Sequence, residues 1–362
     1  MTTREHAMPC RRPSSAFPAA NATALCLCVV LTAPATGVAQ DSGVFAGAVV
    51  AAESRAPLPA ALVYLPDARR RILTGTDGRF RIDGLEPGVH RVLVETIGRV
   101  TVDTTVVVGA PGISVVLPMA ARAIALHGID VDVAPCSESG FDAAAGSAEA
   151  AAVLDELRKN AERYRATQEI EAPVLVMQRD QRLLRRNGRV ARQRTDTIAA
   201  DTTASSYRPG EVLVANVPQL IGLPSTHKMR LPGFQTLASD AFQDAHCFRY
   251  RGLDERDGER RIRIEYVPLL SIRTPDVRGS VYLNPQTFVV TEATFVLTNV
   301  PSTMPNLRSL TATVLYDEPV PGRVLIREIR SEQLLADRRT PTALELQKRV
   351  EYRIREEVLG SA

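Results

Sequence analysis

One short stretch of the chain has residue types that could act as a nucleophile and its base. Ser225 and Lys228 have the Ser-x-x-Lys spacing of serine acyl-transfer enzymes. That chemistry needs the serine at the start of a buried helix, and Ser-Asp-Asn and Lys-Thr-Gly triplets elsewhere in the chain. Neither triplet occurs, and Pro224 and Pro232 predict an irregular loop around the pair. We therefore expect no catalytic site at this position.

Histidine, cysteine and acidic side chains do not form a metal-binding pattern. His246 and Cys247 are adjacent, but zinc normally takes about four ligands, and no Cys-x-x-Cys or His-x-x-x-His accompanies them. Asp77, Asp83 and Glu86 could surround calcium, but the geometry of Asp-Gly turns already explains them. We expect no metal and no other cofactor.

Arginines crowd around one predicted hairpin turn. The turn is Asn187-Gly188, and the arginines near it are Arg179, Arg182, Arg185, Arg186, Arg189, Arg192 and Arg194. A two-residue Asn-Gly turn pairs Arg186 with Arg189, on the face shared with Arg182, while Arg185 and Arg192 occupy the reverse face. Neither face is apolar, so we expect the tip to protrude into solvent.

A solvated hairpin is the first interpretation of this tip. The functional interpretation is contact with lipopolysaccharide phosphates, anionic lipid or an acidic partner, because guanidinium groups form bidentate bonds with such anions. The residues that such a contact would use are Arg182, Arg185, Arg186, Arg189 and Arg192.

Length and composition indicate a packed protein with more than one domain. The 362 residues suffice for two domains, and 45% hydrophobic and 23% charged residues are near the average of soluble globular proteins. The net charge is only +3, so we expect no binding to nucleic acid through overall charge.

The amino-terminal segment has the layout of a secretory signal peptide. Three arginines lie among the first twelve residues, ahead of an apolar run from Ala22 to Ala35 and the small residues Gly37-Val38-Ala39. Pro34 interrupts the run, which is shorter than the ~20 apolar residues of a membrane-spanning helix. We favour cleavage near Ala39 over a membrane anchor. The mature chain is then secreted, in the periplasm or associated with the outer membrane, without a transmembrane segment.

Cysteine usage predicts one disulfide bond. Cleavage near Ala39 would leave Cys136 and Cys247 as the two remaining cysteines, in a compartment that permits oxidation. A bridge between them would close a loop of about 110 residues, which chain-entropy arguments value at roughly 4 to 5 kcal/mol. Non-reducing mass spectrometry should find the two cysteine peptides joined, whereas two freely alkylated thiols would contradict the bridge.

Residues 43–118 have the pattern of a small β-sandwich. About seven short apolar strands are separated by Gly, Pro and Asp turns, which predicts antiparallel pairing. Asp77-Gly78 predicts a tight hairpin between residues 72–74 and 80–82. A turn at Glu86-Pro87-Gly88 leads into a return strand at residues 90–95, where polar and apolar residues alternate as on a half-buried sheet.

Several short motifs occur together in this region. They are Gly47-x-Val49, Pro57-Leu58-Pro59-Ala60-Ala61-x-Val63, Thr76-Asp77-Gly78-x-Phe80, Gly84-Leu85-x-Pro87-Gly88 and Ile97-Gly98. As a set they resemble the carboxypeptidase regulatory-like domain, a transthyretin-type β-sandwich, over about a fifth of the chain. The resemblance implies a fold and no activity of its own. In that family the module is an accessory beside metallopeptidase domains, and in bacteria it often precedes outer-membrane receptors.

A linker and a helix follow the sandwich. Residues 121–146 are rich in Ala, Gly and Ser, and from Ser147 onward apolar residues recur at helical spacing. These apolar residues are Val153, Leu154, Leu157, Ala161 and Tyr164. Charged residues between them predict a solvated opposite face: Asp155, Glu156, Arg158, Lys159, Glu162 and Arg163.

Beyond the helix the pattern is again typical of strands. About eight strands are expected from residue 173 to 355, with hairpin turns at Asn187-Gly188, Asp257-Gly258 and residues 284–287. Charged and apolar residues alternate over residues 261–266, which predicts one wet face and a curved antiparallel sheet with the helix on its dry side. The hairpin at 279–295 resembles one hairpin of periplasmic lipoprotein carriers of the LolA and LolB type.

The segment from Ser205 to Asp244 is long for a connection inside a compact domain. It contains four prolines and several apolar residues, which predicts little regular structure and a role as a lid or binding loop. The apolar residues should pack over something, for which the sheet itself is the simplest candidate.

Together these patterns predict a mainly β protein in three parts. They are a seven-stranded antiparallel sandwich at 40–120, a linker at 121–146, and a helix with a curved antiparallel sheet at 147–362. We expect a non-enzymatic binding or assembly protein of the cell envelope, whose partner is an envelope protein or an anionic envelope surface. Two alternatives stay open: a periplasmic carrier of a lipid or other apolar ligand, and an enzyme with an unrecognised site.

Overall fold

The structure is a computed structural model. It describes residues 43–110, 112–124, 148–171, 173–201, 207–208, 212–217, 226–230, 232–256 and 258–353. The predicted signal segment and most of the predicted linker lie outside these ranges, so cleavage near Ala39 and the linker boundaries stay predictions.

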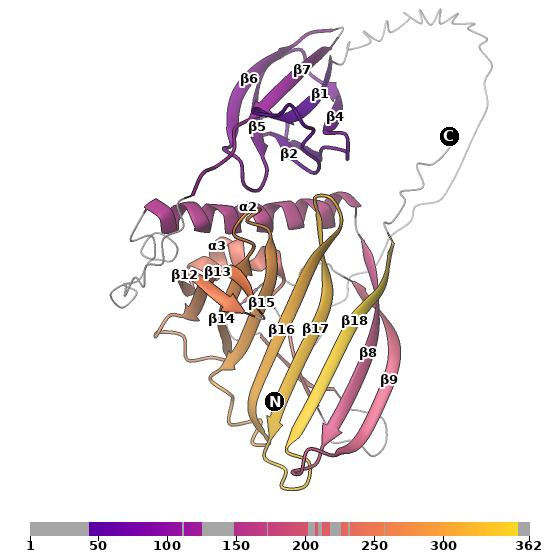
Figure 1. Ribbon diagram of the computed structural model, residues 1–362, viewed down its shortest axis with the longest axis vertical. Coiled ribbons are helices and arrows are strands. Elements are labelled where there is room, and N and C mark those ends of the chain that lie inside the picture. Colours follow the sequence, from indigo (N-terminus) through magenta and orange to yellow (C-terminus); the bar gives the residue numbers. More distant parts are fainter. Residues whose placement is uncertain are drawn as a thin grey trace, which may run out of the picture. The chain divides into compact units, whose positions relative to one another are not determined.

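Seven strands form the amino-terminal sandwich, as predicted (Figure 1). They are β1 (Gly43–Ala51), β2 (Leu62–Leu65), β3 (Arg70–Leu73), β4 (Arg79–Leu85), β5 (Gly88–Glu95), β6 (Val102–Val108) and β7 (Ile113–Met119). One sheet has the order β4-β1-β7 and the other β3-β2-β5-β6. Phe45, Val63, Val92 and Val94 are fully buried between them. The pairing is antiparallel with one exception, because the first and last strands, β1 and β7, run parallel.

The turn at Asp77-Gly78 forms, but the predicted hairpin around it is wrong. Gly78 has a positive φ of 73° and its N–H donates to the Gly75 carbonyl at 2.9 Å. The flanking strands do not pair with each other, since β3 pairs with β2 and β4 pairs with β1. The turn therefore carries the chain from one sheet to the other. A turn signal fixes the local backbone, but it does not specify which strands pair.

The predicted helix is α2 (Ala148–Glu171). Its sequence is rich in alanine, contains no glycine or proline, and ends shortly before Pro173, where a helix is disfavoured. The apolar positions read from the sequence are all buried, as expected: Val153, Leu154, Leu157, Ala161 and Tyr164. They join the core of the large sheet, and Figure 1 shows α2 lying across one end of its strands.

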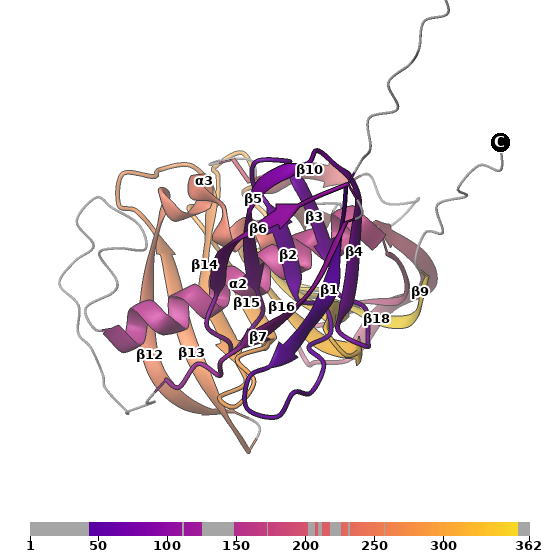
Figure 2. The same cartoon turned by 90° about the horizontal axis from the view of Figure 1, so that it is seen from above.

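A nine-stranded antiparallel sheet forms the rest of the described chain. Its strands are β8 (Val174–Leu184), β9 (Val190–Asp201), β12 (His246–Arg256), β13 (Glu259–Pro268), β14 (Asp276–Leu283), β15 (Val290–Thr298), β16 (Leu307–Val320), β17 (Arg323–Leu335) and β18 (Thr342–Arg353). The order is β12-β13-β14-β15-β16-β17-β18-β8-β9. The last strand, β18, thus pairs with β8, which directly follows the helix. Figure 2 shows the curvature of this sheet around α2.

The dry face of the sheet is densely aromatic. Ile262, Ile264 and Tyr266 are fully buried, which confirms the alternation predicted for this strand. The rings of Tyr164 on α2 and Phe234 lie 5.9 Å apart, and Phe234 lies 5.5 Å from Tyr316 on β16. Such aromatic contacts fix the helix to the sheet beyond simple burial of apolar area.

The segment from 205 to 244 is more regular than predicted. It contains the antiparallel pair β10 (Leu213–Val217) and β11 (Thr226–Met229), a 3-10 turn η1 (Phe234–Ala238), and the short helix α3 (Asp240–Gln243). Phe234, Leu237 and Phe242 are buried in the core of the large sheet, so this part of the segment packs on the sheet itself. Other parts lie outside the described residues, and a role as a lid is untested.

No helix in the described ranges is long and apolar enough to cross a membrane.

Candidate functional site

The candidate nucleophile and metal positions, at which we expected no such site, can be compared with the structure where they are described. Ser225 lies outside the described residues, and Lys228 belongs to strand β11, not to a helix that Ser225 would open. Asp77 accepts a hydrogen bond from the Arg79 N–H at 3.0 Å and so completes its own turn, while Asp83 pairs with Arg81 at 2.8 Å. Within the described part of the chain, no group of three His, Cys, Asp or Glu residues is placed to hold a metal ion.

His246 is a core residue, fully buried and stacked on Phe242 at 3.7 Å. Its two ring nitrogens each lie 3.0 Å from a backbone carbonyl oxygen, of Phe242 and of Val277. Nε2 also lies 3.3 Å from the carboxylate of Asp276, which accepts a hydrogen bond from the Tyr207 hydroxyl at 2.5 Å. Burial, followed by that bond to Asp276, raises the pKa of Tyr207 well above its ordinary value. The polar groups of this cluster are thus bonded to one another and to the backbone within the core.

Cys247 is buried beside it at the start of β12. Cys136 lies outside the described residues, so the Cys136–Cys247 disulfide stays a prediction.

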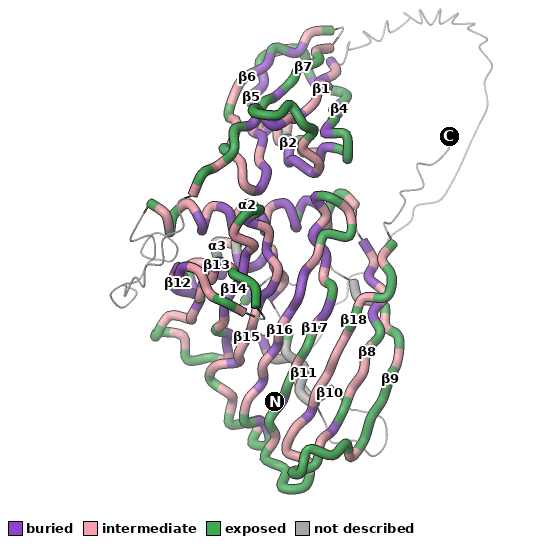
Figure 3. The backbone as a smooth tube through the Cα atoms, in the orientation of Figure 1, coloured by how far each residue is buried: buried purple, intermediate pink, exposed green. Residues whose placement is uncertain are grey.

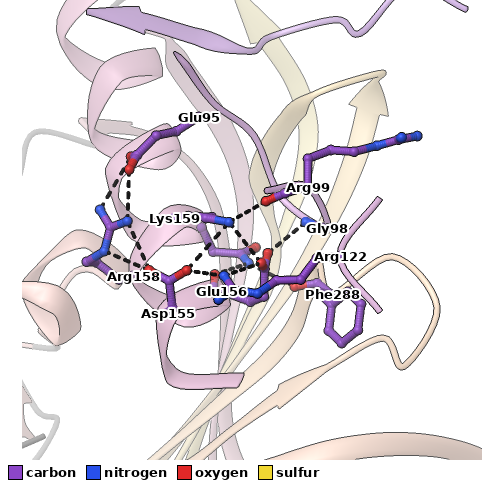
Figure 4. A network of polar contacts seen from close by, with 10 residues as sticks. Glu95, Gly98, Arg99, Arg122, Asp155, Glu156, Arg158, Lys159 and Phe288 are labelled. Atoms are coloured by element: carbon purple, nitrogen blue, oxygen red, sulfur yellow. Dashed lines mark hydrogen bonds and ion pairs between the residues drawn. The ribbon is translucent and has the colours of Figure 1, made fainter. Parts of the chain in front are cut away.

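The main site that the sequence missed is the charged face of α2. The charged pattern predicts a solvated face, but Glu156, Lys159, Asn160 and Arg163 are at most 8% exposed. Figure 4 shows why: this face meets residues at the end of the sandwich, such as Gly98 and Arg99, and the turn of the large sheet at Phe288. The prediction failed because charge patterning on a helix does not reveal a second domain that covers it.

At the centre of this junction is a buried ion pair between Glu156 and Lys159, 3.0 Å apart and both nearly inaccessible to solvent (Figure 4). The Glu156 carboxylate accepts the backbone N–H of Gly98 at 2.7 Å, in the loop between β5 and β6. The Lys159 ammonium donates to the Arg99 carbonyl at 2.6 Å. The guanidinium of Arg122 lies 3.3 Å from Glu156. The helix thus holds backbone groups of the sandwich with side chains whose charges compensate each other.

A second layer of charge surrounds the pair. Arg158 donates to Glu95 of β5 at 2.9 Å and to Asp155 at 3.0 Å, and Arg122 also pairs with Asp155. Burial raises the pKa of Asp155, but the hydrogen bond from Arg122 and the charges of Lys159 and Arg158 lower it by more, so the net shift is downward. The carboxylate is therefore ionised at neutral pH and contributes to the junction.

The same face also holds the sheet. Asn160 donates to the Phe288 carbonyl at 2.8 Å and accepts the Val290 N–H at 3.0 Å, so its amide completes the turn between β14 and β15. Arg163 donates to the Gly322 carbonyl at 2.7 Å, in the turn between β16 and β17. Burial lowers the pKa of Arg163, and Glu318 opposes that shift.

Apolar contacts complete the junction. Ile97, from the sandwich loop, is buried within the core of the large sheet rather than that of the sandwich. Beside the polar network a pocket of about 590 Å³ opens between the sandwich and α2, lined by Leu62, Tyr64, Pro66, Arg69, Arg71, Leu93, Glu95, Arg158, Glu162 and Arg165. Several of its charged groups pair within the chain, as Arg71 does with Glu169 and Arg165 with Glu162. The junction connects the sandwich to α2 and the large sheet. Among its described residues no nucleophile lies beside a general base.

The arginine-rich hairpin is the predicted site that the structure places at the surface. Its five predicted contact residues, Arg182, Arg185, Arg186, Arg189 and Arg192, are all exposed (Figure 3). The predicted register is wrong by one residue: Arg185 N–H donates to the Arg189 carbonyl at 2.8 Å, so Arg186 lies in a three-residue loop and not opposite Arg189. Gly188, with φ +76°, takes the left-handed position in that loop.

Charge compensation differs along this hairpin. In its body Arg179 binds Asp196 through two hydrogen bonds at 2.8 and 2.5 Å, and Arg182 pairs with Asp180 at 2.6 Å. Among the described residues no carboxylate pairs with Arg185, Arg186, Arg189 or Arg192. Four guanidinium groups at the tip are therefore available to an anion.

Two further arginines join the tip, and the sequence did not reveal them. Thr342 of β18 pairs with Leu184 of β8, which places the loop between β17 and β18 beside the hairpin loop. That loop carries the exposed Arg338 and Arg339. About 150 residues separate the two loops, and only the pairing of β18 with β8 brings them together. We call this set the basic end: Arg185, Arg186, Arg189, Arg192, Arg338 and Arg339.

Comparison with known proteins identifies the amino-terminal module. Residues 44–118 match the carboxypeptidase regulatory-like domain, which confirms the resemblance read from the sequence. No curated protein matches the chain.

Similar solved structures cover different shares of this chain. A streptococcal ancillary pilin is 20% identical over 22% of this chain and 30% of its own, with a TM-score of 0.20. A DUF1329 family protein from Desulfovibrio piger is 13% identical over 57% of this chain and 95% of its own, with a TM-score of 0.31. An outer-membrane lipoprotein-sorting protein domain from Vibrio parahaemolyticus is 9% identical over 56% and 93%, with a TM-score of 0.29. The chain spans about a third of the pilin it matches. At these values the likenesses assign no function.

Proposed function

We propose that this protein is a non-enzymatic binding or assembly protein of the bacterial cell envelope, which contacts a phosphate-bearing envelope surface through its basic end. The observation that carries the proposal is the group of exposed arginines without carboxylate partners at one end of the large sheet. Guanidinium groups bind phosphate by paired hydrogen bonds and keep their charge at any physiological pH.

The position of the basic end supports this role. It lies at the end of the strands opposite α2 (Figure 1). Strand β8 runs from next to the end of α2 to the basic end, and its 11 residues at ~3.3 Å each span roughly 35 Å. The arginines are therefore presented away from the buried junction that holds the carboxypeptidase regulatory-like domain. The chain would hold that module at a distance from the surface it contacts.

The inner face of the sheet does not favour the alternative of an apolar-ligand carrier in this half of the molecule. Val314, Ile329, Gln347 and Arg179 are directly opposed across four strands, so they share the face on which the core lies. The row thus changes from apolar to charged as it approaches β9, where Arg179 meets Asp196. Leu175 and Met177 on the same face of β8 are apolar and buried, so the charged positions lie on the part of β8 nearer the basic end. An apolar ligand over that part would have to cover the Arg179–Asp196 pair.

Vesicle binding tests the proposal. The full chain without its signal segment should bind vesicles that contain phosphatidylglycerol at low salt and not vesicles of phosphatidylcholine alone. Changing Arg185, Arg186 and Arg189 to Gln should weaken that binding at least tenfold, because each arginine near an anionic surface contributes about 1 kcal/mol. The free energy of unfolding should change by no more than about 0.5 kcal/mol, because these side chains are exposed.

The matched control changes three exposed arginines elsewhere, Arg260, Arg273 and Arg278, to Gln. It removes the same charge, so an equal loss of binding would show that net charge and not the basic end is responsible. Failure of the unaltered chain to bind at low salt would reject the proposal.

A further inference from the structure

We propose that the edge of β9 is a docking site for an acidic, extended segment of a partner protein, which would add to the large sheet as a tenth strand. This site differs from the surface contact proposed above, because it uses backbone groups along β9 and not the loops of the basic end; Arg192, on β9, belongs to both.

The two edges of the large sheet differ in how they are protected. At one edge, β12 contacts α2 and α3, and its pairing with β13 is broken by an irregularity between Tyr250 and Leu253, where Gly252 has a φ of +76°. Bulges and covering elements are the usual means by which proteins prevent strand pairing at an edge. This edge is therefore closed to further strands.

The opposite edge is regular over most of its length, because the register shift between β8 and β9 lies at the hairpin end, between Leu183 and Leu184. From Arg192 to Asp201, β9 pairs with β8 without a shift in register, and among the described strands only β8 pairs with it. Its sequence contains no proline or glycine and includes the β-branched Thr195, Thr197 and Ile198. A regular, unpaired edge offers a row of backbone N–H and C=O groups that an added strand can bond to.

The charges of β9 indicate which segment would fit. Arg192 is exposed and has no carboxylate partner among the described residues. A second copy of β9 would offer Asp196, but that carboxylate is already held by Arg179 at 2.5 Å and by Arg194 at 2.9 Å. The hydrogen bond from Arg179 also lowers the pKa of Asp196, so the carboxylate stays ionised and engaged. A segment with its own acidic residues is the complement that β9 lacks.

The register gives the pattern of such a segment. Arg192, Arg194, Asp196 and Ile198 alternate along one face of β9, and directly opposed residues of an added antiparallel strand would share that face. The complement has an apolar residue opposite Ile198, a neutral one opposite Asp196, and acidic residues opposite Arg194 and Arg192. The probe is therefore the capped peptide Val-Thr-Thr-Thr-Glu-Thr-Glu, labelled with a fluorophore.

The experiment measures binding of this peptide to the full chain without its signal segment, by fluorescence anisotropy. A peptide with lysine in place of each glutamate should not bind, and N-methylation of alternate amides should weaken binding at least tenfold, because it removes ladder hydrogen bonds. Arg192→Glu should weaken binding by about tenfold, whereas Arg260→Glu, an exposed strand arginine on β13, should leave it unchanged. Hydrogen exchange should show slower exchange of β9 amides when the peptide is bound.

Each contrary result rejects the docking site. Equal binding of the N-methylated peptide would show attraction by charge alone, and absence of binding would show that the edge is closed. A dimer in sedimentation that buries β9 would identify a second copy as the occupant. The outcome is independent of the surface contact, because the variant of Arg185, Arg186 and Arg189 should lose vesicle binding and keep hydrogen-exchange protection of β9 by the peptide.

Discussion

The two ends of the large sheet use charged residues in opposite ways. At the α2 end, Glu156 and Lys159 are almost fully buried, and each is held by the other and by a backbone group of the sandwich. At the basic end, Arg186 and Arg189 are exposed, and no described carboxylate pairs with them. The charges of Glu156 and Lys159 are compensated by groups of the same chain. The charges of Arg186 and Arg189 remain available to a binding partner.

This difference follows from the physics of desolvation. A buried ion must be paired and hydrogen-bonded, because removing it from water costs several kcal/mol, so a buried pair specifies the one geometry that satisfies it. An exposed arginine costs little to leave unpaired and contributes little to stability. The α2 end should therefore decide how the modules are joined, and the basic end should decide what the protein binds.

The largest expected effect is the loss of the buried charge at Glu156. Glu156→Gln keeps the shape of the side chain but removes the nearer counter-ion of the buried Lys159 ammonium, which keeps only the half-buried Asp155 carboxylate at 3.5 Å. We expect a loss of up to about 3 kcal/mol in the free energy of unfolding. Urea unfolding monitored by circular dichroism measures it. Arg186→Gln at the basic end is the matched control and should change stability by no more than about 0.5 kcal/mol.

The double variant Glu156→Gln with Lys159→Met sharpens the same comparison. It removes both charges and should recover a substantial part of the stability lost in the single variant, because no unpaired ion remains buried. If the single variant lost less than about 1 kcal/mol, the junction would have to be open to water, and the contrast between the two ends would fail.

A smaller effect is expected from a glycine at each end. Gly322 has a φ of +84°, and a Cβ there would lie 2.4 Å from the Cβ of Ala60 and 2.5 Å from a guanidinium nitrogen of Arg163. Gly188 has a φ of +76°, and a Cβ there would have no atom within 4 Å. Gly188→Ala should cost about 1 kcal/mol for the left-handed backbone, and Gly322→Ala more than that because crowding is added. Equal thermal unfolding of the two variants would contradict the close packing at the α2 end.

The strands, the helix and most turns could be predicted from the sequence because their signals are local. Val153, Leu157 and Tyr164 show the helical period, and Asn284 marks a turn that forms, with its side-chain oxygen accepting the Gln286 N–H at 2.8 Å. Which strands pair with each other was harder to predict from the sequence. The Asp77-Gly78 turn was located correctly, but it connects two sheets and not two neighbouring strands.

The candidate site was predictable only in part, because some of its residues come together through long-range contacts that local sequence signals do not show. The hairpin arginines are close in sequence, so their cluster could be seen, but Arg338 and Arg339 join it through the pairing of β18 with β8. The buried role of Glu156 and Lys159 depends on contacts with Gly98 and Arg99, about 60 residues earlier. A charged helix face is predicted to be exposed to solvent unless the surface that covers it is known.

The smallest expected effect is a pH dependence that separates the two ends. Asp155 at the junction has a pKa below its ordinary value, since hydrogen bonding to Arg122 and nearby positive charges outweigh burial. A carboxyl group whose folded pKa is depressed stabilises the fold above its unfolded value, near ~3.9, and this contribution is lost as pH falls through the folded value. The difference in unfolding free energy between the unaltered chain and Asp155→Asn should therefore be constant above about pH 5 and shrink toward pH 3.

Asp337 at the basic end also has a lowered pKa, from the backbone N–H of Arg339 and the Thr340 hydroxyl, but it is fully exposed. Asp337→Asn should show the same direction and a smaller change in urea unfolding across that range. A larger change for Asp337 than for Asp155 would mean that the junction carboxylates do not carry the acid sensitivity of this fold.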